Sequence, residues 1–238
     1  MLFLAVFCGF LAEYQLEHKI EKDRAKELAK SLYQELKNDS ITAGIKVQNR
    51  IKAENALLYI INYFKTGDIT RVPKLFAVNF LYGINFRTPS LFEPRTVILD
   101  QLKNSGSLRY FKNGRLQSLI GDLTVLIINI HDRQELESQS RQLYINPLII
   151  SHYDYDFDFR LRDGDNTTIE KITKYETGND SIPFQLKGVD KLDKERFINV
   201  LSFYRTNGIS STRITFIQKY IELNAELLKE LRKEYHLD

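Results

Sequence analysis

Apolar residues recur every three or four positions along most of the chain, with charged residues between them. This spacing gathers the apolar side chains on one face of an α-helix, so the pattern predicts a mainly α-helical protein. From Glu13 to Lys37 there is neither Gly nor Pro, and the sequence predicts a long charged helix that continues from an uncharged start. Such a helix is typical of a stalk or coiled coil.

A turn is predicted at residues 38–40, Asn-Asp-Ser, because these residue types favour turns and helix N-caps. A second amphipathic helix follows and stops near Gly67. Helices joined by so short a turn pack antiparallel, so residues 17–66 are expected to form a long αα-hairpin. Residues 1–16 before it are interpreted as a membrane-anchor segment.

Residues 67–150 are predicted to form a helical core. Within it, Gly106 suits the left-handed position that ends a helix, and Pro147 breaks the helical pattern. The expected helices cover residues 72–86, a short stretch from Glu93-Pro94 to about 104, and residues 116–143.

Residues 151–189 are predicted to be an extended segment followed by a polar loop. Aromatic and charged residues alternate strictly from His152 to Arg162, and a period of two favours an extended chain with one buried face. Residues 163–183 are rich in Gly, Asn, Asp and Thr, which favour loops. Residues 190–238 are predicted to be C-terminal helices that pack on the bundle, interrupted near Asn207-Gly208.

The first twelve residues carry no charge and no strong helix breaker. As a helix they would extend roughly 18 Å, whereas the apolar core of a bilayer is about 30 Å thick. The segment is therefore too short to span a membrane alone. The residues expected to contact the membrane are Leu2, Phe3, Leu4, Val6, Phe7, Phe10 and Leu11.

Four interpretations of this segment compete. A signal peptide is disfavoured, because no Lys or Arg precedes the apolar run and no small-x-small cleavage site follows it. A lipoprotein is disfavoured, because Phe7 stands before Cys8 where that processing needs a small residue. The end of a spanning helix and a buried helix end in a soluble core stay open, and the continuous charged helix that follows favours the first.

Composition limits the classes of protein. The chain has 238 residues, 43% hydrophobic and 27% charged, which is typical of a folded domain. The net charge is only +3, and basic residues are interleaved with acidic ones, so a nucleic-acid-binding surface is not expected. Cys8 is the only cysteine, which excludes an intrachain disulfide and a CxxC redox pair.

No catalytic motif was found. The four histidines form no HExxH motif, and neither GxGxxG nor GxxxxGK occurs. Asp154, Asp156 and Asp158 resemble the start of a calcium loop, but Phe159 stands where its tight turn needs Gly. We therefore predict no catalytic residue, cofactor or metal. The possible surface for a ligand or partner is Tyr153, Tyr155, Phe157 and Phe159, although an aromatic stripe at regular spacing is more often part of a core.

The run from Thr88 to Phe111 resembles the centre of an uncharacterised family of bacterial membrane proteins, with its Leu-x-x-Ser-Gly-x-Leu core at 102–108. The end of the charged helix at residues 32–39 is also similar. The resemblance implies an N-terminally anchored helical protein without an assigned activity. It also implies a single-pass protein of the bacterial inner membrane, with its main domain on the periplasmic side.

The expected function is that of a non-catalytic accessory or scaffold subunit at the cell envelope. It would contact membrane lipid and a protein partner or a second copy of the chain. One alternative is a sensory domain that binds a ligand, which requires a concave cavity with convergent polar groups. Another is an enzyme, which requires strongly perturbed titratable groups in a cleft.

Overall fold

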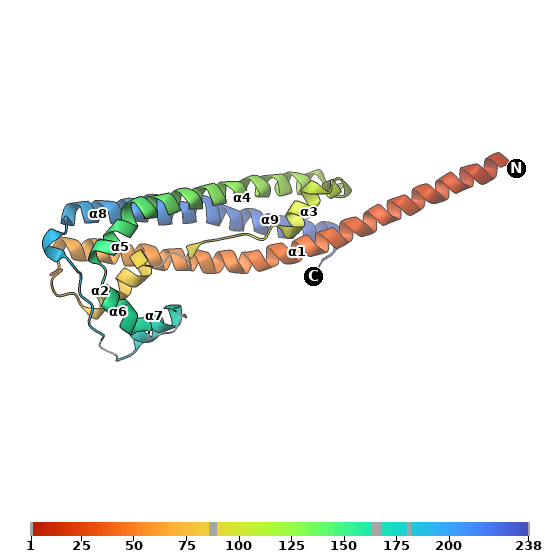
Figure 1. Cartoon of the computed structure of the whole chain (residues 1–238). Coiled ribbons are helices and arrows are strands. Elements are labelled where there is room, and N and C mark those ends of the chain that lie inside the picture. The colour runs from red at the N-terminus through yellow and green to blue at the C-terminus, as the bar shows by residue number, and fades with distance from the viewer. Residues whose placement is uncertain (1, 86–89, 163–167, 180–181, 238) are drawn as a thin grey trace. The chain divides into compact units, whose positions relative to one another are not determined.

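The computed structural model describes residues 2–85, 90–162, 168–179 and 182–237, with the side chains of residues 2–5 and 168 left out. Helices make up most of these ranges, which contain no β-strand, so the prediction of a mainly α-helical protein is confirmed. The α-helices are α1 (Leu2–Thr66), α2 (Lys74–Phe80), α3 (Val97–Asn104), α4 (Gly114–Ser140), α5 (Asn146–His152), α6 (Tyr155–Arg162), α7 (Thr168–Thr177), α8 (Lys194–Phe203) and α9 (Gln218–Tyr235) (Figure 1).

Short turns of other helical types join several of these helices. Those with 3₁₀ geometry are η3 (Ser107–Tyr110) and η5 (Val189–Lys191). Those with π geometry are η1 (Leu81–Asn85), η4 (Arg141–Ile145), η6 (Tyr204–Ser210) and η7 (Arg213–Ile217).

The chain divides into two compact units. Unit 1 contains residues 1–44, 93–129 and 219–238. Unit 2 contains residues 45–92 and 130–218. The helices α1 and α4 contribute residues to both units.

The predicted hairpin over residues 17–66 was wrong, because α1 continues without a break through residues 38–40. The polar side chains that favour a turn make tertiary hydrogen bonds instead. The Asp39 carboxylate accepts from the backbone N–H of Arg95 at 2.8 Å and from the Tyr220 hydroxyl at 3.0 Å. The Asn224 amide donates to the Ser40 hydroxyl at 3.1 Å. These bonds satisfy the polar groups without ending the helix.

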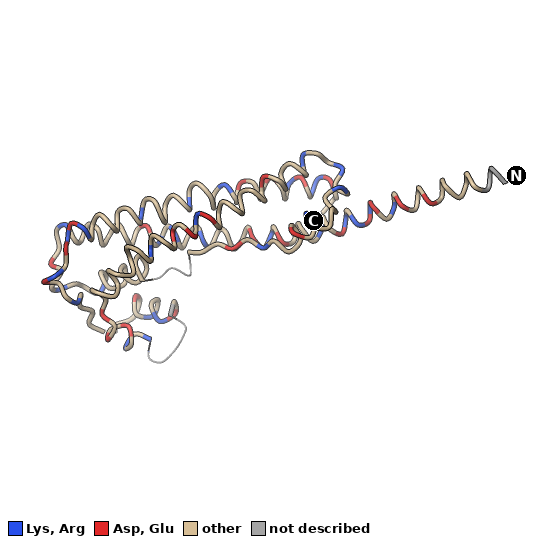
Figure 2. The backbone as a smooth tube through the Cα atoms, turned by 45° about the horizontal axis from the view of Figure 1, so that its top comes forward, with Lys and Arg blue, Asp and Glu red and all other residues tan. Residues whose placement is uncertain are grey.

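Unit 1 is held together by aliphatic packing around α1. Buried side chains on this helix include Ala25, Ala29, Leu32 and Leu36, which recur at intervals of three or four residues. Small alanines allow the neighbouring helices to approach closely. The facing helices α4 and α9 contribute buried leucines at 116, 119, 123, 227 and 231. Acidic and basic residues alternate along α1 after its uncharged start (Figure 2).

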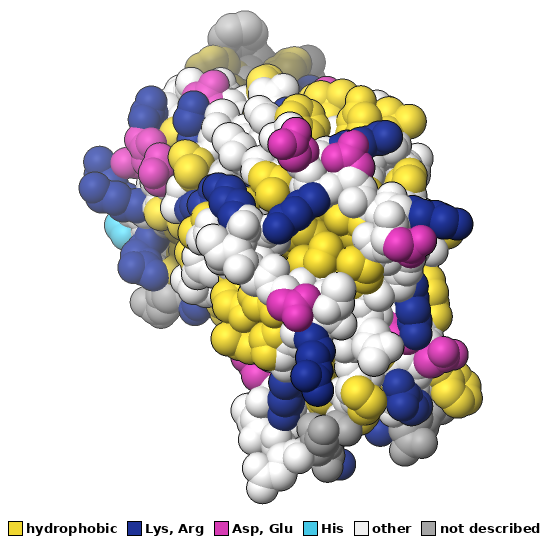
Figure 3. Space-filling model, turned by 90° about the vertical axis from the view of Figure 1, so that its left-hand side faces the viewer, with side chains coloured by type: hydrophobic (Ala, Val, Ile, Leu, Met, Phe, Trp, Pro, Cys, Tyr) yellow, Lys and Arg dark blue, Asp and Glu magenta, His cyan; other side chains and the backbone are white. Residues whose placement is uncertain are grey.

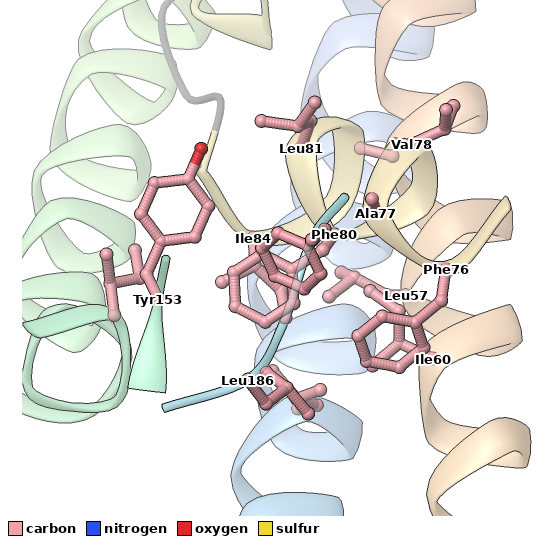
Figure 4. Packing of buried hydrophobic residues seen from close by; sticks show 14 of the residues in the cluster. Leu57, Ile60, Phe76, Ala77, Val78, Phe80, Leu81, Ile84, Tyr153 and Leu186 are labelled. Carbon is pink, nitrogen blue, oxygen red and sulfur yellow. The ribbon is translucent and has the colours of Figure 1, made fainter. Parts of the chain in front are cut away.

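Unit 2 has an aromatic core. The rings of Phe64 and Phe197 stack with centroids 4.3 Å apart, and Phe80 stacks on Tyr153 at 5.6 Å. Side chains of α1, α2 and η1 meet Tyr153 and Leu186 in one cluster (Figure 4). Gly83 is required here, because a Cβ atom would lie only 3.0 Å from the backbone nitrogen of Leu57.

The predicted extended segment from His152 to Arg162 was wrong, because residues 155–162 form α6. The Asp154 carboxylate accepts from the backbone N–H groups of Phe157 at 3.3 Å and Gln185 at 3.2 Å, so it caps the new helix. Apolar or aromatic residues occupy every second position here, but only those four positions apart, Phe157 and Leu161 among them, are buried. A spacing of four matches one face of an α-helix, so the alternation also fits a helix.

Several other boundaries differ from the sequence expectation. The loop expected at 163–183 contains α7, while residues 163–167 and 180–181 lie outside the described ranges. The short helix begins at Val97 rather than at Glu93-Pro94, and Gly106 after it has the expected left-handed φ of 68°. The break expected at Pro147 is instead the first turn of α5. The interruption expected at Asn207-Gly208 is the π-turn η6.

Candidate functional site

The N-terminal segment of α1 carries large apolar side chains on its surface. Phe7 is 53% exposed, Phe10 69% and Leu11 45%, and Val6 is exposed as well. The side chains of the other three predicted membrane-contacting residues, Leu2, Phe3 and Leu4, lie outside the described part. In the described residues no helix has an apolar stretch long enough to cross a membrane.

The four aromatic residues predicted to form a ligand or partner surface are divided by the structure. Tyr153 and Phe157 are buried in the core of unit 2, whereas Tyr155 and Phe159 are exposed. Burial and the neighbouring Asp158, whose carboxylate accepts from the Tyr153 hydroxyl at 2.7 Å, raise the pKa of Tyr153. The four side chains therefore form no common surface.

Sequence reasoning missed a buried polar centre in unit 2. We define this centre by five side chains that are each at most 8% exposed: Arg50, Glu137, Arg141, Tyr204 and Thr212. They come from α1, α4, η4, η6 and the two residues between η6 and η7.

Arg50 connects the centre to three parts of unit 2. Its Nε donates to the backbone oxygen of Ser90 at 3.0 Å, and its Nη1 donates to that of Ile209 at 3.3 Å. The same Nη1 lies 3.1 Å from Oε2 of Glu137, forming an ion pair with no solvent exposure on the arginine. A buried ion pair recovers its desolvation cost only when further hydrogen bonds satisfy both groups.

Not all polar atoms of this pair are satisfied. The Thr212 hydroxyl donates to Oε2 of Glu137 at 3.3 Å. Nη2 of Arg50 and Oε1 of Glu137 have no hydrogen-bond partner in the described ranges. Such orphaned groups are uncommon in folded proteins and point to a further ligand or water.

Arg141 lies one turn beyond Glu137 in the same helical run. Its Nη2 donates to the backbone oxygen of Asn85 at 3.1 Å, while its Nη1 has no partner among the residues that the structure describes. Burial raises the pKa of Tyr204, with a further contribution from Glu137 that Arg141 opposes. Tyr204 is therefore a neutral phenol at physiological pH.

The π-turn η6 provides the space for this arrangement. A Cβ atom on Gly208 would lie 3.2 Å from the ring of Tyr204 and 3.6 Å from Cγ of Glu137. A π-turn inserts one residue into a helix, and such turns occur frequently at functional sites. The Asn207-Gly208 pair was read from sequence only as a helix interruption. Helical spacing aligns Arg50 with the buried Val47 and Leu57, but it does not identify the partners of Arg50.

Two further arginines lie next to this centre around Glu54. Arg213 forms a bidentate ion pair with the Glu54 carboxylate at 2.6 and 2.9 Å. Arg205 donates to the backbone oxygen of Glu54 at 3.2 Å. Arg205 therefore adds positive charge without neutralising a carboxylate.

Unit 1 contains a contrasting pair of buried carboxylates. Oε2 of Glu35 accepts from the backbone N–H of Ile98 at 3.2 Å, in the first turn of α3, and Asp39 binds the N–H of Arg95 just before it. Glu35 therefore supplies the N-terminal cap that the Thr96 side chain does not provide, while Asp39 fixes the chain just before α3. Burial raises the pKa of both carboxyls.

Surface hollows also occur in unit 2. One of about 430 Å³ is lined by Arg71, Lys74 and Tyr175, and the Lys74 ammonium in it already donates to the backbone oxygen of Gly178. A smaller one of about 120 Å³ is lined by Lys52, Tyr82 and Ser90, among others. The face shown in Figure 3 has several hydrophobic patches separated by charged side chains.

No family model matches the chain, and no similar curated protein or solved structure was found. The resemblance of residues 88–111 to a family of bacterial membrane proteins therefore stays an expectation. The first two residues of this run, 88 and 89, lie outside the described ranges.

Proposed function

We propose that the protein is anchored at a membrane by the start of α1 and acts there as a non-catalytic accessory or scaffold subunit. The observation that carries this proposal is the exposed apolar surface at Val6, Phe7, Phe10 and Leu11. A helix that is apolar on all sides is stable only when it is buried in protein or in lipid.

The anchor would enter the membrane without crossing it alone. Eleven residues from Leu2 to Ala12 extend roughly 16 Å as a helix, about half of the apolar core of a bilayer. The charged part of α1 begins at Glu13 and would remain in water. A partner helix, or a second copy of this one, would cover the rest of the span.

Contacts with another protein are the second part of the proposal. The long charged helix and the absence of a recognised catalytic motif in the sequence favour a role in holding other proteins. From the family resemblance we further propose the bacterial inner membrane, with the helical units on the periplasmic side. Labelling of a cysteine introduced at exposed Ile41 with a membrane-impermeant maleimide, in intact cells of the Cys8→Ser variant, tests that orientation.

Membrane binding is tested by flotation of the full-length protein with liposomes in a density gradient. We expect the wild-type protein to float with the liposomes and the Phe7→Asp/Phe10→Asp variant to remain at the bottom, because buried charge is costly in lipid. Ile41→Asp is the matched control, since Ile41 is 64% exposed on the same helix outside the anchor.

Three results would overturn the proposal. Wild-type protein that stays monomeric at the bottom of the gradient does not bind lipid. Equal flotation of the wild-type and double-variant proteins would mean that another surface binds the membrane. Flotation lost in the Ile41→Asp variant as well would assign binding to the charged part of α1 instead of the anchor.

A further inference from the structure

The buried polar centre of unit 2 and its surroundings contain more positive than negative side chains. Four arginines, at positions 50, 141, 205 and 213, accompany two glutamates, at positions 54 and 137. Two ion pairs join Arg50 to Glu137 and Arg213 to Glu54. Neither Arg141 nor Arg205 has a carboxylate within 4 Å in the described part of the chain.

Arg141 has the greater need of a counter-charge, because it is only 8% exposed whereas Arg205 is partly exposed to water. Its hydrogen bond to the Asn85 carbonyl supplies a dipole but no negative charge. An uncompensated buried charge costs several kcal/mol, which a bound counter-charge removes.

The unsatisfied donors belong to the two buried guanidinium groups. Nη2 of Arg50 and Nη1 of Arg141 each retain N–H groups without a partner among the described residues. Glu137 forms an ion pair with Arg50, and both Glu137 and Arg141 act electrostatically on Tyr204. The two buried guanidinium groups therefore belong to one cluster of side chains. Guanidinium N–H groups bind oxyanions and halides strongly when water is excluded.

We propose that the buried polar centre binds a small monovalent anion, held by the free N–H groups of Arg141 and Arg50. Chloride, or a carboxylate as small as formate, has the required single negative charge. A small anion is favoured, because all five side chains of the centre are at most 8% exposed. The unpaired Oε1 of Glu137 would bind an ordered water beside the anion, since it can only accept hydrogen bonds.

The first test is thermal unfolding of the full-length protein in increasing sodium chloride or formate. The ionic strength is held constant with sodium gluconate, whose anion is far bulkier than chloride or formate. Binding to the folded state should raise Tm along a saturating curve, by about 2–5 °C at ten times the dissociation constant. The variant Arg141→Gln should lose this dependence, because its amide carries no charge.

Arg109→Gln is the matched control, since Arg109 is an exposed arginine of unit 1 and its loss should leave the chloride dependence intact. A Tm that rises equally in chloride and gluconate, or equally in wild type and Arg141→Gln, overturns the proposal. If Arg141→Gln does not fold, Arg141→Lys replaces it. That variant keeps the charge but loses the planar N–H geometry and should weaken chloride binding at least several-fold.

The second test locates the anion directly. Crystals of the wild-type protein soaked in sodium bromide should show an anomalous difference peak within hydrogen-bonding distance of Arg141 Nη1. Density that refines as water, without an anomalous signal, would mean that the centre is satisfied by solvent only, and the proposal would be wrong.

Discussion

The buried carboxylates at α3 in unit 1 and the buried guanidinium of Arg50 in unit 2 are satisfied by opposite kinds of backbone group. In unit 1 the carboxylates of Glu35 and Asp39 receive backbone N–H groups at the start of α3. In unit 2 the guanidinium of Arg50 donates to the backbone oxygens of Ser90 and Ile209 and to Glu137. Each buried charge thus fixes a chain segment distant in sequence, and the sign of the charge decides which backbone groups it fixes.

The difference also predicts how each unit tolerates loss of its charge. A carboxylate that caps a helix can be replaced by a neutral acceptor with modest cost. A member of a buried ion pair cannot, because its partner remains charged and desolvated. Unit 2 should therefore be the more sensitive of the two.

The largest effect is expected from Glu137→Ala. Removal of this carboxylate leaves Arg50 unpaired in the core of unit 2, so the free energy of unfolding should fall by about 3–5 kcal/mol. Glu135→Ala is the control, because Glu135 lies on the same helix and is exposed. Urea denaturation measures both values. A loss for Glu137→Ala no greater than that for Glu135→Ala would contradict the assignment of the centre.

A second prediction compares the two faces of α6. Phe157→Ala should destabilise the protein by about 3–4 kcal/mol, because Phe157 is fully buried and a cavity would remain. Phe159→Ala should change the stability by less than about 0.5 kcal/mol, since that ring is 77% exposed. Equal effects in thermal denaturation would favour the extended segment that the sequence predicted.

Loss of the Asp39 carboxylate in unit 1 should have a smaller effect. Asp39→Ala removes an acceptor from the Arg95 N–H and the Tyr220 hydroxyl, and should cost about 1–3 kcal/mol. Asp39→Asn keeps an oxygen at this position and should cost less than Asp39→Ala. Hydrogen exchange of the Arg95 amide would report the local loss. If this amide exchanges in both variants as it does in wild type, Asp39 does not accept its hydrogen bond.

The smallest effect is a dependence on pH in unit 1. Burial raises the pKa values of Glu35 and Asp39, so the folded state binds protons more tightly than the unfolded state. Their contribution is unfavourable above the raised pKa values and is relieved as pH falls through them towards the ordinary values. In unfolding experiments at several pH values, the free energy of unfolding of the Glu35→Gln variant should rise less than that of wild type as the pH falls through this range. An unchanged pH dependence would contradict the raised pKa of Glu35.

The sequence predicted the helical class correctly, together with the long helix that follows Gly114 and the left-handed Gly106. The spacing of apolar residues shows whether a helix can bury one of its faces, and this is sufficient to predict an amphipathic helix. It does not report tertiary partners. The Asp39 side chain, which predicted a turn, instead accepts hydrogen bonds from the Arg95 N–H and the Tyr220 hydroxyl while the helix continues. The Asp154 side chain accepts from the Phe157 N–H and so begins a helix in a segment whose apolar residues recur every two positions.

The buried polar centre could not be predicted for the same reason. Arg50 lies at the helical spacing of the buried Val47, Ala53 and Leu57, so the local pattern can place it on the inner face of α1. The same holds for Glu137, three and seven positions after the buried Gln134 and Ile130, but the pattern does not show that the two residues meet. They are 87 positions apart, and their pairing depends on the tertiary fold. The N-terminal apolar segment differs from the buried polar centre in that its composition alone, without knowledge of the fold, was sufficient to predict contact with a membrane.

The proposed membrane anchor can be tested most directly at Cys8, the only cysteine in the chain and an exposed one. A nitroxide attached to Cys8 of the full-length protein in liposomes reports its depth through collisions with apolar oxygen and with a water-soluble nickel chelate. The label should collide readily with oxygen and rarely with the chelate. A label at an Ile41→Cys substitution in the Cys8→Ser background should do the opposite. Ready collision of the Cys8 label with the chelate in the presence of lipid would contradict the anchor.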